Sequence, residues 1–282
     1  MNAIIYGLLA ETSIHVGSGQ STGFVDLPFH REAATDYPVI AGSSVKGALR
    51  DLARQRMGED DGNLANVFGK QEHAGTLVIS DARLLLLPVR SMTSSYRWLT
   101  CPHLIERALR DYQRAYNRSK NLDLGQVIAI EKNQYLGRGD GSLYLEERQF
   151  EAAKEPLPDP LYAFLASFIP HPHTHDRLRN HVAVLHDDDF VWFARHGLAI
   201  TARNNLHKEH KTSLNLWYEE TLPPDSLLYV LLLERQSGGL SLVSQLFEQA
   251  PYMQIGGNET VGQGWFAVHC AHASTSAPGE SA

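Results

Sequence analysis

Two long apolar runs constrain the fold more than any other feature: LLLLPV at residues 84–89 and LLYVLLL at residues 227–233. Each has the length of a buried strand, and both are far shorter than the roughly 20 residues that a helix needs to cross a bilayer. The sequence also lacks a basic N-terminal segment followed by a long apolar one. We therefore expect a folded protein that stays in the cytoplasm and has no membrane partner.

The elements around these two strands predict an α+β fold. A helix is expected at residues 43–57, where Val45 and Leu49 share an apolar face, and another at about 240–249. Strands are expected at residues 3–14 and just before the tail. The order strand, helix, strands, insertions, helix, strand fits a ferredoxin-like (RRM-like) palm decorated with inserted helical segments and hairpins. A doubly wound parallel sheet is disfavoured because helices do not alternate regularly with strands.

The chain has no long linker, so we expect a single domain over residues 1–272, with insertions at about 90–185. The last ten residues, 273–282, have the composition of a disordered tail. Two strands, at 194–204 and 213–220, flank NLHKEHKT, as in a β-hairpin with a basic tip.

The net charge of −7 argues against a nucleic-acid partner only if charge is averaged over the whole surface. Between Arg83 and Lys120 the chain has eight basic residues and two acidic ones, Glu106 and Asp111. Such segregation is compatible with a basic groove on an acidic body. The helix expected at 102–116 carries a basic stripe that is either a solvated face or a phosphate track, formed by Arg107, Arg110, Arg114 and Arg118.

Three glycine-rich stretches lack the residues that nucleotide-binding loops need: GSGQSTG (17–23), GSSVKGALR (42–50) and GGNETVGQG (256–264). The first misses the dinucleotide fingerprint by one residue, and the other two lack the Lys-Ser/Thr end of a P-loop. No nucleotide cofactor is therefore expected. The stretches are either tight turns or places where backbone amides face a phosphodiester chain.

A zinc site and a hydrolytic triad are both disfavoured. HPHTHDRLRNH (171–181) is expected to be a polar loop with solvated histidines, because alternating loop histidines without cysteine partners rarely form a zinc site. His15, Ser18 and Asp26 are the residue types of a hydrolytic triad, but the chain has no G-x-S-x-G elbow. The two cysteines are 169 residues apart in sequence, as Cys101 and Cys270, and suggest no disulfide framework.

Four stretches together resemble one known family. They are, in the same order as in that family, IHVGSGQSTGFVDLPFHREAATDYPVIAGSSVKGALR (14–50), DDDFVWFARHGLAI (187–200), LWYEETLPPDSLLY (216–229) and QIGGNETVGQGW (254–265). The chain is similar to the RAMP (repeat-associated mysterious protein) backbone subunits of the type III-B CRISPR effector, the Cmr complex. The resemblance implies a single RAMP domain with a thumb hairpin at about residues 200–216. It also implies several copies stacked along one guide RNA beside other Cmr subunits, and cleavage of complementary target RNA at six-nucleotide intervals.

The resemblance implies that Asp26, the aspartate of the D-L-P segment, is the cutting residue, with His15, Glu219 and Glu220 near the site. One acid can suffice, because RNA carries its own nucleophile in the 2′-hydroxyl and gains most of its cleavage rate from positioning. Asp26 would accept the hydroxyl proton or hold a divalent cation, Mg²⁺ or Mn²⁺, and a 2′,3′-cyclic phosphate would remain. On sequence alone, Asp26 could instead cap a turn before Pro28.

The same reasoning assigns RNA-binding residues. Lys46 and Arg50 lie near the start of the first predicted helix, whose amides favour phosphate. The other candidates are Ser43 and Ser44 before that helix, Ser18, Gly19, Gly256 and Gly257 in the glycine stretches, and Lys208 and Lys211 at the hairpin tip. Contacts with guide RNA should be independent of sequence.

Two other functions remain open. The chain could be a scaffold subunit of the same complex that does not cut. It could also be a stand-alone RAMP endoribonuclease that processes precursor guide RNA, with His15 or His30 as the general base.

Overall fold

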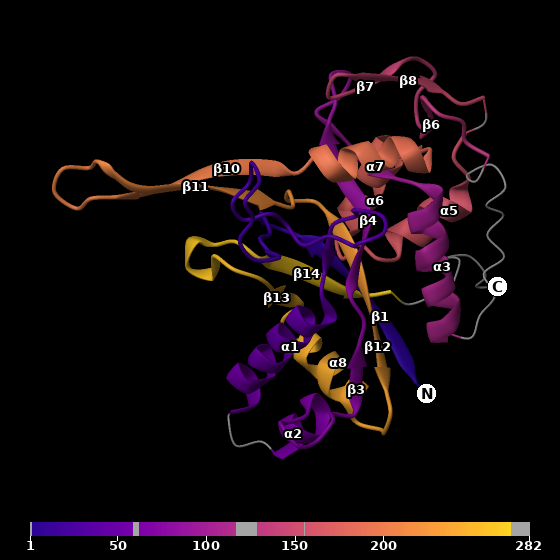
Figure 1. Cartoon of the computed structure of the whole chain (residues 1–282). Helices are drawn as coiled ribbons and strands as arrows, with labels where there is room; N and C mark the ends of the chain where they lie inside the picture. Colours follow the sequence, from indigo (N-terminus) through magenta and orange to yellow (C-terminus); the bar gives the residue numbers. More distant parts are fainter. Residues whose placement is uncertain (1, 59–61, 117–128, 155, 272–282) are drawn as a thin grey trace, which may run out of the picture.

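The computed structural model describes residues 2–58, 62–116, 129–154 and 156–271 of the chain (Figure 1). Its elements are, in chain order, β1 (Ala3–Ala10), β2 (Val39–Ile40), α1 (Gly42–Met57), α2 (Gly62–Phe68), β3 (Leu77–Ile79), β4 (Ala82–Arg90), β5 (Tyr96–Thr100), α3 (Pro102–Tyr116), β6 (Gln134–Gly137), β7 (Leu143–Leu145), β8 (Arg148–Ala152), α5 (Asp159–Ala166), α6 (Pro172–His181), β9 (Val182–Leu185), α7 (Asp187–His196), β10 (Ala199–Leu206), β11 (Ser213–Thr221), β12 (Leu227–Glu234), α8 (Gly239–Gln249), β13 (Tyr252–Gln254), the 3₁₀ helix η1 (Glu259–Val261) and β14 (Trp265–Cys270).

A ferredoxin-like palm is formed by β1, α1, β4, β12, α8 and β14. These elements follow one another as strand, helix, strand, strand, helix, strand, and their strands lie side by side in the antiparallel order β14-β1-β12-β4. The two apolar runs of the sequence are β4 and β12, which pair directly, with Leu86 opposite Leu227. The predicted α+β fold is therefore confirmed, and the insertions and the hairpin all lie between β4 and β12.

The insertions extend the sheet and cover the face that a bare palm would leave open. Strands β5, β9, β6, β8 and β7 continue the sheet beyond β4, and the pairs β5–β9 and β6–β8 are parallel. Helices α3, α5 and α6 pack on one face of the sheet, and α1 and α8 pack on the other (Figure 1). Because the central strands are buried on both faces, they read as continuous apolar runs in the sequence.

The central strand β1 shows how the two cores divide. Leu8 belongs to the cluster that contains Val45 of α1, whereas Leu9, one residue later, belongs to the cluster that contains Phe168. Successive side chains of a strand point to opposite faces, so this is the expected alternation. Gly7 leaves room for the second cluster, because a Cβ atom there would lie 1.9 Å from the carbonyl oxygen of Phe168.

A separate two-stranded sheet, β10–β11, projects from the body (Figure 1), and we call it the thumb (residues 199–221). The strands pair from Ala199 opposite Thr221 to Leu206 opposite Ser213. The hairpin expected at about 200–216 is present, and its second strand runs on to Thr221. The first strand was predicted to begin at residue 194, which is wrong, because α7 continues to His196.

Residues 171–181 were expected to be a polar loop, which is also wrong. They form α6, which has Pro172 in its first turn and buries Leu178 in the core. A single apolar residue in a polar stretch gives almost no helical periodicity. The predicted tail at 273–282 lies outside the described residues. Among the described helices, none is long and apolar enough to cross a membrane.

Candidate functional site

The segment that contains Asp26 is attached to the base of the thumb. The Leu27 amide donates to the Tyr218 carbonyl at 3.1 Å, and the Glu220 amide donates to the Leu27 carbonyl at 3.0 Å. Leu27 and Glu219 form a parallel bridge, so the segment lies beside β11 as a short third strand. Asp26 is therefore held at the root of the thumb by the backbone pairing of the next residue.

The Asp26 carboxylate accepts a hydrogen bond from the Tyr218 amide, with Oδ2 at 2.8 Å from the nitrogen. This partner is on β11, far from Pro28 in sequence, so the side chain does more than cap a local turn. Asp26 is partly exposed and lines a hollow of about 370 Å³. The other lining residues come from the first glycine stretch, from the residue after Asp26 and from β11: Gln20, Ser21, Leu27, Asn215, Leu216 and Trp217.

His15 lies between the glycine stretches at 17–23 and 256–264. Its Nδ1 atom is 2.9 Å from the Glu220 carbonyl oxygen, which can only accept, so Nδ1 carries the proton that is donated. In the neutral ring, Nε2 is then the acceptor. The His15 carbonyl accepts from the Gly257 amide at 2.9 Å, and a Cβ atom at Gly256, where φ is 99°, would lie 2.4 Å from that carbonyl oxygen. Glycine at 256 therefore lets the stretch at 256–264 pack against His15.

Glu219 is enclosed at the thumb root, with 4% of its surface exposed. Its carboxylate accepts from Trp217 Nε1 at 2.8 Å, from Arg203 Nε at 3.1 Å and from Asn258 Nδ2 at 3.0 Å. Burial alone would raise the pKa of Glu219, but the hydrogen bonds from these three partners outweigh it and hold the pKa below its ordinary value. The carboxylate thus stays charged, and both of its oxygens are occupied.

Glu220 is also enclosed, with 7% exposed, and faces a different set of partners. Oε1 pairs with the Arg31 guanidinium at 2.7 Å, and Oε2 accepts from the Phe29 amide at 2.9 Å. Neither glutamate lines the Asp26 hollow. The predicted catalytic role of Glu219 and Glu220 stays a prediction, and their surroundings favour a structural one. Arg203 and Asn258 could not be predicted as partners of Glu219, because they lie 16 and 39 residues from it along the chain.

Lys46 and Arg50 line a second hollow, of about 550 Å³, together with Lys70 and His73 from the loop after α2. Within the described part of the chain, neither Lys46 nor Arg50 forms an ion pair, so their charges are available to an anion. The start of α1 is less open than predicted, because the Gly42 amide donates to Asp81 Oδ1 at 2.7 Å. Phosphate binding by Ser43 and Ser44 at that helix end therefore stays a prediction with an acidic competitor beside it.

The predicted basic stripe along α3 is only partly paired inside the protein. Arg107 pairs with Glu32 at 2.6 Å, and Arg83 pairs with Asp111 at 2.7 Å. Arg110 lies 3.9 Å from Glu106. Of the other residues counted in this region, Arg118 and Lys120 lie outside the described residues. Arg107 is therefore engaged in the packing of α3, whereas Arg110 and Arg114 are exposed, and their role as a solvated face or a phosphate track stays open.

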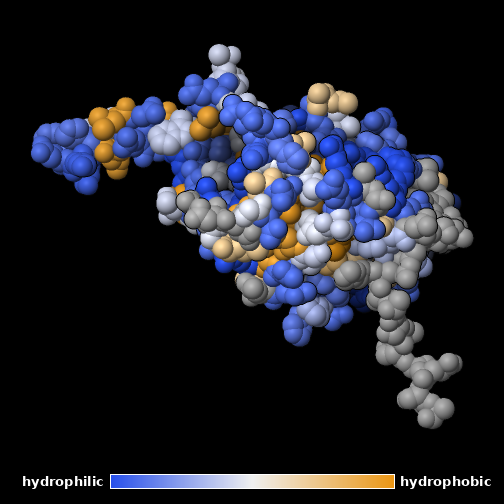
Figure 2. Space-filling model, turned by 90° about the horizontal axis from the view of Figure 1, so that it is seen from below, coloured by the Kyte–Doolittle hydropathy of each residue, from blue (hydrophilic) through white to orange (hydrophobic). Residues whose placement is uncertain are grey.

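The thumb carries an exposed apolar face that the sequence analysis missed. Its members share one side of the hairpin, with exposed fractions from 42% to 61%: Ile200, Leu206, Leu214, Leu216 and Tyr218. Figure 2 shows apolar residues on the projecting hairpin. Alternation in β11 was the available signal, because Asn215 and Trp217 separate Leu214, Leu216 and Tyr218. The tip residues Lys208 and Lys211 are exposed beyond this face.

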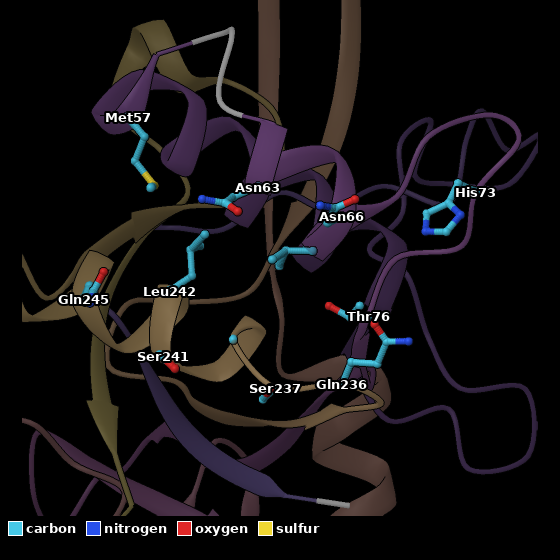
Figure 3. A pocket seen from close by; sticks show the side chains of 12 residues that line it. Met57, Asn63, Asn66, His73, Thr76, Gln236, Ser237, Ser241, Leu242 and Gln245 are labelled. Carbon is cyan, nitrogen blue, oxygen red and sulfur yellow. The ribbon is translucent and has the colours of Figure 1, made fainter.

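A further hollow, of about 520 Å³, lies between α2 and α8 (Figure 3). It is lined mainly by carboxamides and hydroxyl groups, among them Asn66, Thr76, Ser241 and Gln245, and it shares no lining residue with the Asp26 hollow. The residues described here contain no group of three or more histidine, cysteine or carboxylate side chains that could hold a metal ion. A cation at Asp26 would therefore need further oxygen ligands from RNA and water.

The sequence and the fold of this chain are both similar to those of known proteins. The sequence model of the RAMP superfamily matches residues 8–267. The chain is 31% identical to the CRISPR system Cmr endoribonuclease Cmr4 of Pyrococcus furiosus, over 95% of each protein. The crystal structure of oligomeric Cmr4 from the same organism superposes with a TM-score of 0.74 at 25% identity, covering 96% of this chain and 98% of that one. A chain in a type III-B Cmr-beta structure bound to cognate target RNA shares the fold, with a TM-score of 0.79 at 23% identity and the same coverage. The chain belongs to the RAMP superfamily.

Proposed function

We propose that this chain is a backbone subunit of a type III-B CRISPR effector. Several copies lie along one guide RNA beside the other Cmr subunits, and together they cut complementary target RNA at six-nucleotide intervals. The proposal is supported by the family and by the identity to a Cmr endoribonuclease over nearly the whole chain. The observation that carries the cutting role is the Asp26 carboxylate, held by a β11 amide at the edge of an open hollow.

In the proposed reaction, the target RNA supplies the nucleophile. The 2′-hydroxyl oxygen forms a bond to the adjacent phosphorus, the bond from phosphorus to the 5′ oxygen breaks, and Asp26 accepts the hydroxyl proton. The leaving 5′ oxygen takes a proton from water, so the products are a 2′,3′-cyclic phosphate and a 5′-hydroxyl. Because the Tyr218 amide donates to Oδ2, we assign the proton transfer to Oδ1. The protein gains most by holding the sugar oxygen in line with the phosphorus.

The apolar face of the thumb gives a physical means of creating that alignment. Proteins that kink nucleic acids insert apolar side chains between base steps and unstack them. Leu214 and Leu216 are exposed for such a contact, and Leu216 also lines the Asp26 hollow. A nucleotide splayed by the thumb would therefore place its phosphodiester beside the carboxylate.

A divalent cation, Mg²⁺ or Mn²⁺, fits this donor set as part of the RNA complex. Mg²⁺ usually keeps several waters and binds through one or two carboxylates together with substrate phosphates. Asp26 is the one carboxylate among the residues lining the hollow, so phosphate oxygens would complete the ligands. When bound, the ion would neutralise charge that develops on the phosphate.

Guide RNA binding is assigned to residues on both sides of the palm. Lys46 and Arg50, on α1, would contact phosphates of the guide RNA. Gly256 and Gly257 would allow the RNA backbone to approach the protein closely from the other side. Ser18, Gly19, Lys208 and Lys211 complete the proposed surface, and all four are exposed. These contacts read the backbone and not the bases, since guide pairing carries the sequence information.

The test is a cleavage assay on the reconstituted, guide-loaded complex with end-labelled complementary RNA, with and without Mg²⁺. We expect a ladder with six-nucleotide steps that disappears when Asp26→Asn is present in every copy, while target binding is retained. An unchanged ladder with Asp26→Asn would leave the chain as a scaffold. Cleavage of a precursor hairpin by the isolated chain, without a ladder on the target, would instead support the stand-alone processing enzyme.

A further inference from the structure

Among the contacts that hold the thumb root, one carboxylate links both thumb strands to the loop at residues 256–264. Glu219 accepts from Trp217 on its own strand, from Arg203 on β10 and from Asn258 in the glycine stretch at 256–264. Asn258 itself is held in the left-handed conformation, with φ of 61°, and also donates to Gln263 Oε1 at 2.9 Å. Glu219 thus joins both thumb strands to the loop that packs on His15.

The Asp26 segment is attached to the same short piece of β11. Tyr218, which precedes Glu219, donates its amide to Asp26 and accepts from the Leu27 amide. Glu220, which follows it, donates its amide to the Leu27 carbonyl. Any rotation of the thumb about Glu219 therefore carries Asp26 with it and changes its offset from the glycine loop.

Glu219 has no oxygen left for direct chemistry. Oε1 is taken by Trp217, Oε2 is shared by Arg203 and Asn258, and the side chain does not line the Asp26 hollow. Breaking a buried charge pair leaves the partner charge without compensation, which costs far more than an exposed pair contributes. The network is therefore suited to fixing an angle.

We propose that Glu219 is a positioning residue that sets the angle of the thumb against the glycine loop and thereby aligns Asp26 with one phosphodiester. This inference rests on the function proposed above. It assigns to Glu219 a role in the precision of cleavage, exerted through Asp26, and it extends that role to Asn258 as the anchor on the body.

The variants that test this are Glu219→Gln and Asn258→Ala, singly and together. A glutamine keeps one acceptor oxygen but turns an NH₂ group toward the existing donors, whereas Asn258→Ala removes only the anchor on the loop. Glu209→Gln is the matched control, because it makes the same change on the thumb tip, where the Glu209 side chain is 81% exposed. Thermal melting identifies any variant that has not folded.

The first readout is cleavage at single-nucleotide resolution in the reconstituted complex. We expect both single variants to slow the main cut by about 100-fold and to spread cutting to neighbouring phosphodiesters, since small misplacement is enough for such a loss. The double variant should be no worse than the more affected single one, because both act on one network. The slope of the pH–rate profile should be unchanged, and Glu209→Gln should cut like the wild type.

The second readout is backbone hydrogen exchange in the isolated chain, which does not depend on cleavage. Exchange in residues 24–30 and 256–264 should rise by about tenfold or more in Glu219→Gln and in Asn258→Ala. Unchanged exchange in both segments would overturn the inference. So would a Glu219→Gln complex that cuts at unchanged positions with a flattened pH–rate limb, since that is the signature of an acid–base group. If the wild-type complex gave no Asp26-dependent ladder, the proposed function would fail, and exchange would still decide the coupling.

Discussion

The palm and the thumb are both β structures with leucine-rich strands, but only the palm buries them. All eight residues of β12 are buried, with helices on both faces of the sheet. In the thumb, Leu214 and Leu216 are more than half exposed on a hairpin that projects from the body (Figures 1 and 2). A two-stranded hairpin is only marginally stable by itself in water. Leucine side chains therefore stabilise the fold in the palm, whereas in the thumb they form an exposed apolar surface that is available for contact.

The thumb root joins these two regimes through polar contacts. Apolar burial fixes the palm, whereas Glu219 and Glu220 hold the root with directed hydrogen bonds and ion pairs. Such directional contacts fix the angle between the thumb and the palm, which apolar packing along a two-stranded hairpin would not do. Asp26 lies at this junction and not on either region, so the hypothesis of a lone cutting acid depends on the geometry of the junction.

The largest expected effect contrasts equal truncations in the two regions. Leu232→Ala removes a fully buried palm side chain and should lower the free energy of unfolding by about 2–5 kcal/mol. Leu214→Ala removes an exposed thumb side chain and should change it by less than about 0.5 kcal/mol. Urea unfolding followed by circular dichroism measures both. Equal losses in the two variants would mean that the thumb face is covered within the folded chain.

A second test asks whether the exposed thumb face acts on RNA. Leu214→Ser with Leu216→Ser should leave stability nearly unchanged but slow target cleavage by about tenfold or more, because polar side chains could not act as the apolar wedge that separates two stacked bases. The matched control is Thr201→Ser on the other face of β10. Single-turnover cleavage of labelled target by the reconstituted complex gives the rates. A double serine variant that cuts at the wild-type rate would exclude the wedge.

The palm could be predicted from the sequence because its information is local. Runs such as LLYVLLL are buried by helices whose own apolar faces repeat at helical spacing, so type and order follow from periodicity. The α6 helix could not be found, because Leu178 is its one buried side chain. At the site, Asp26 was found through the family motif, but the partners of Glu219 could not be. Arg203 and Asn258 reach it only after the hairpin and the glycine loop have folded, and no spacing in the sequence encodes that contact.

A third, smaller effect concerns the cations of the palm that have no partner within the described residues. Lys46→Ala and Arg50→Ala should each weaken guide RNA binding by a few-fold at moderate salt and lower the slope of log K against log salt by about 0.7. Arg110→Ala, which removes an exposed charge 3.9 Å from Glu106, is the control and should change neither quantity. Filter binding across a salt series measures the slope. If Arg110→Ala lowered the salt slope more than Lys46→Ala, the phosphate-binding surface would lie on α3 and not on α1.

The smallest expected effect is on pH dependence, and it isolates the thumb root from the palm. Burial of Glu219 is outweighed by the hydrogen bonds from Trp217, Arg203 and Asn258, so its pKa lies below the ordinary value of 4.5. A carboxyl whose pKa is lowered by folding stabilises the folded state above its unfolded pKa, and this stabilisation is lost as the pH falls through the folded pKa. Below about pH 4.5 the wild type should therefore lose melting temperature more steeply than Glu219→Gln, which has no such proton to take up. Glu32 and Glu234, whose pKa values are also lowered, titrate in both proteins, so the difference between the two curves reports Glu219. Parallel melting curves from pH 7 to pH 3 would show that the charge of Glu219 contributes no stability, and the thumb root would then be held by its other contacts, among them the Glu220–Arg31 pair.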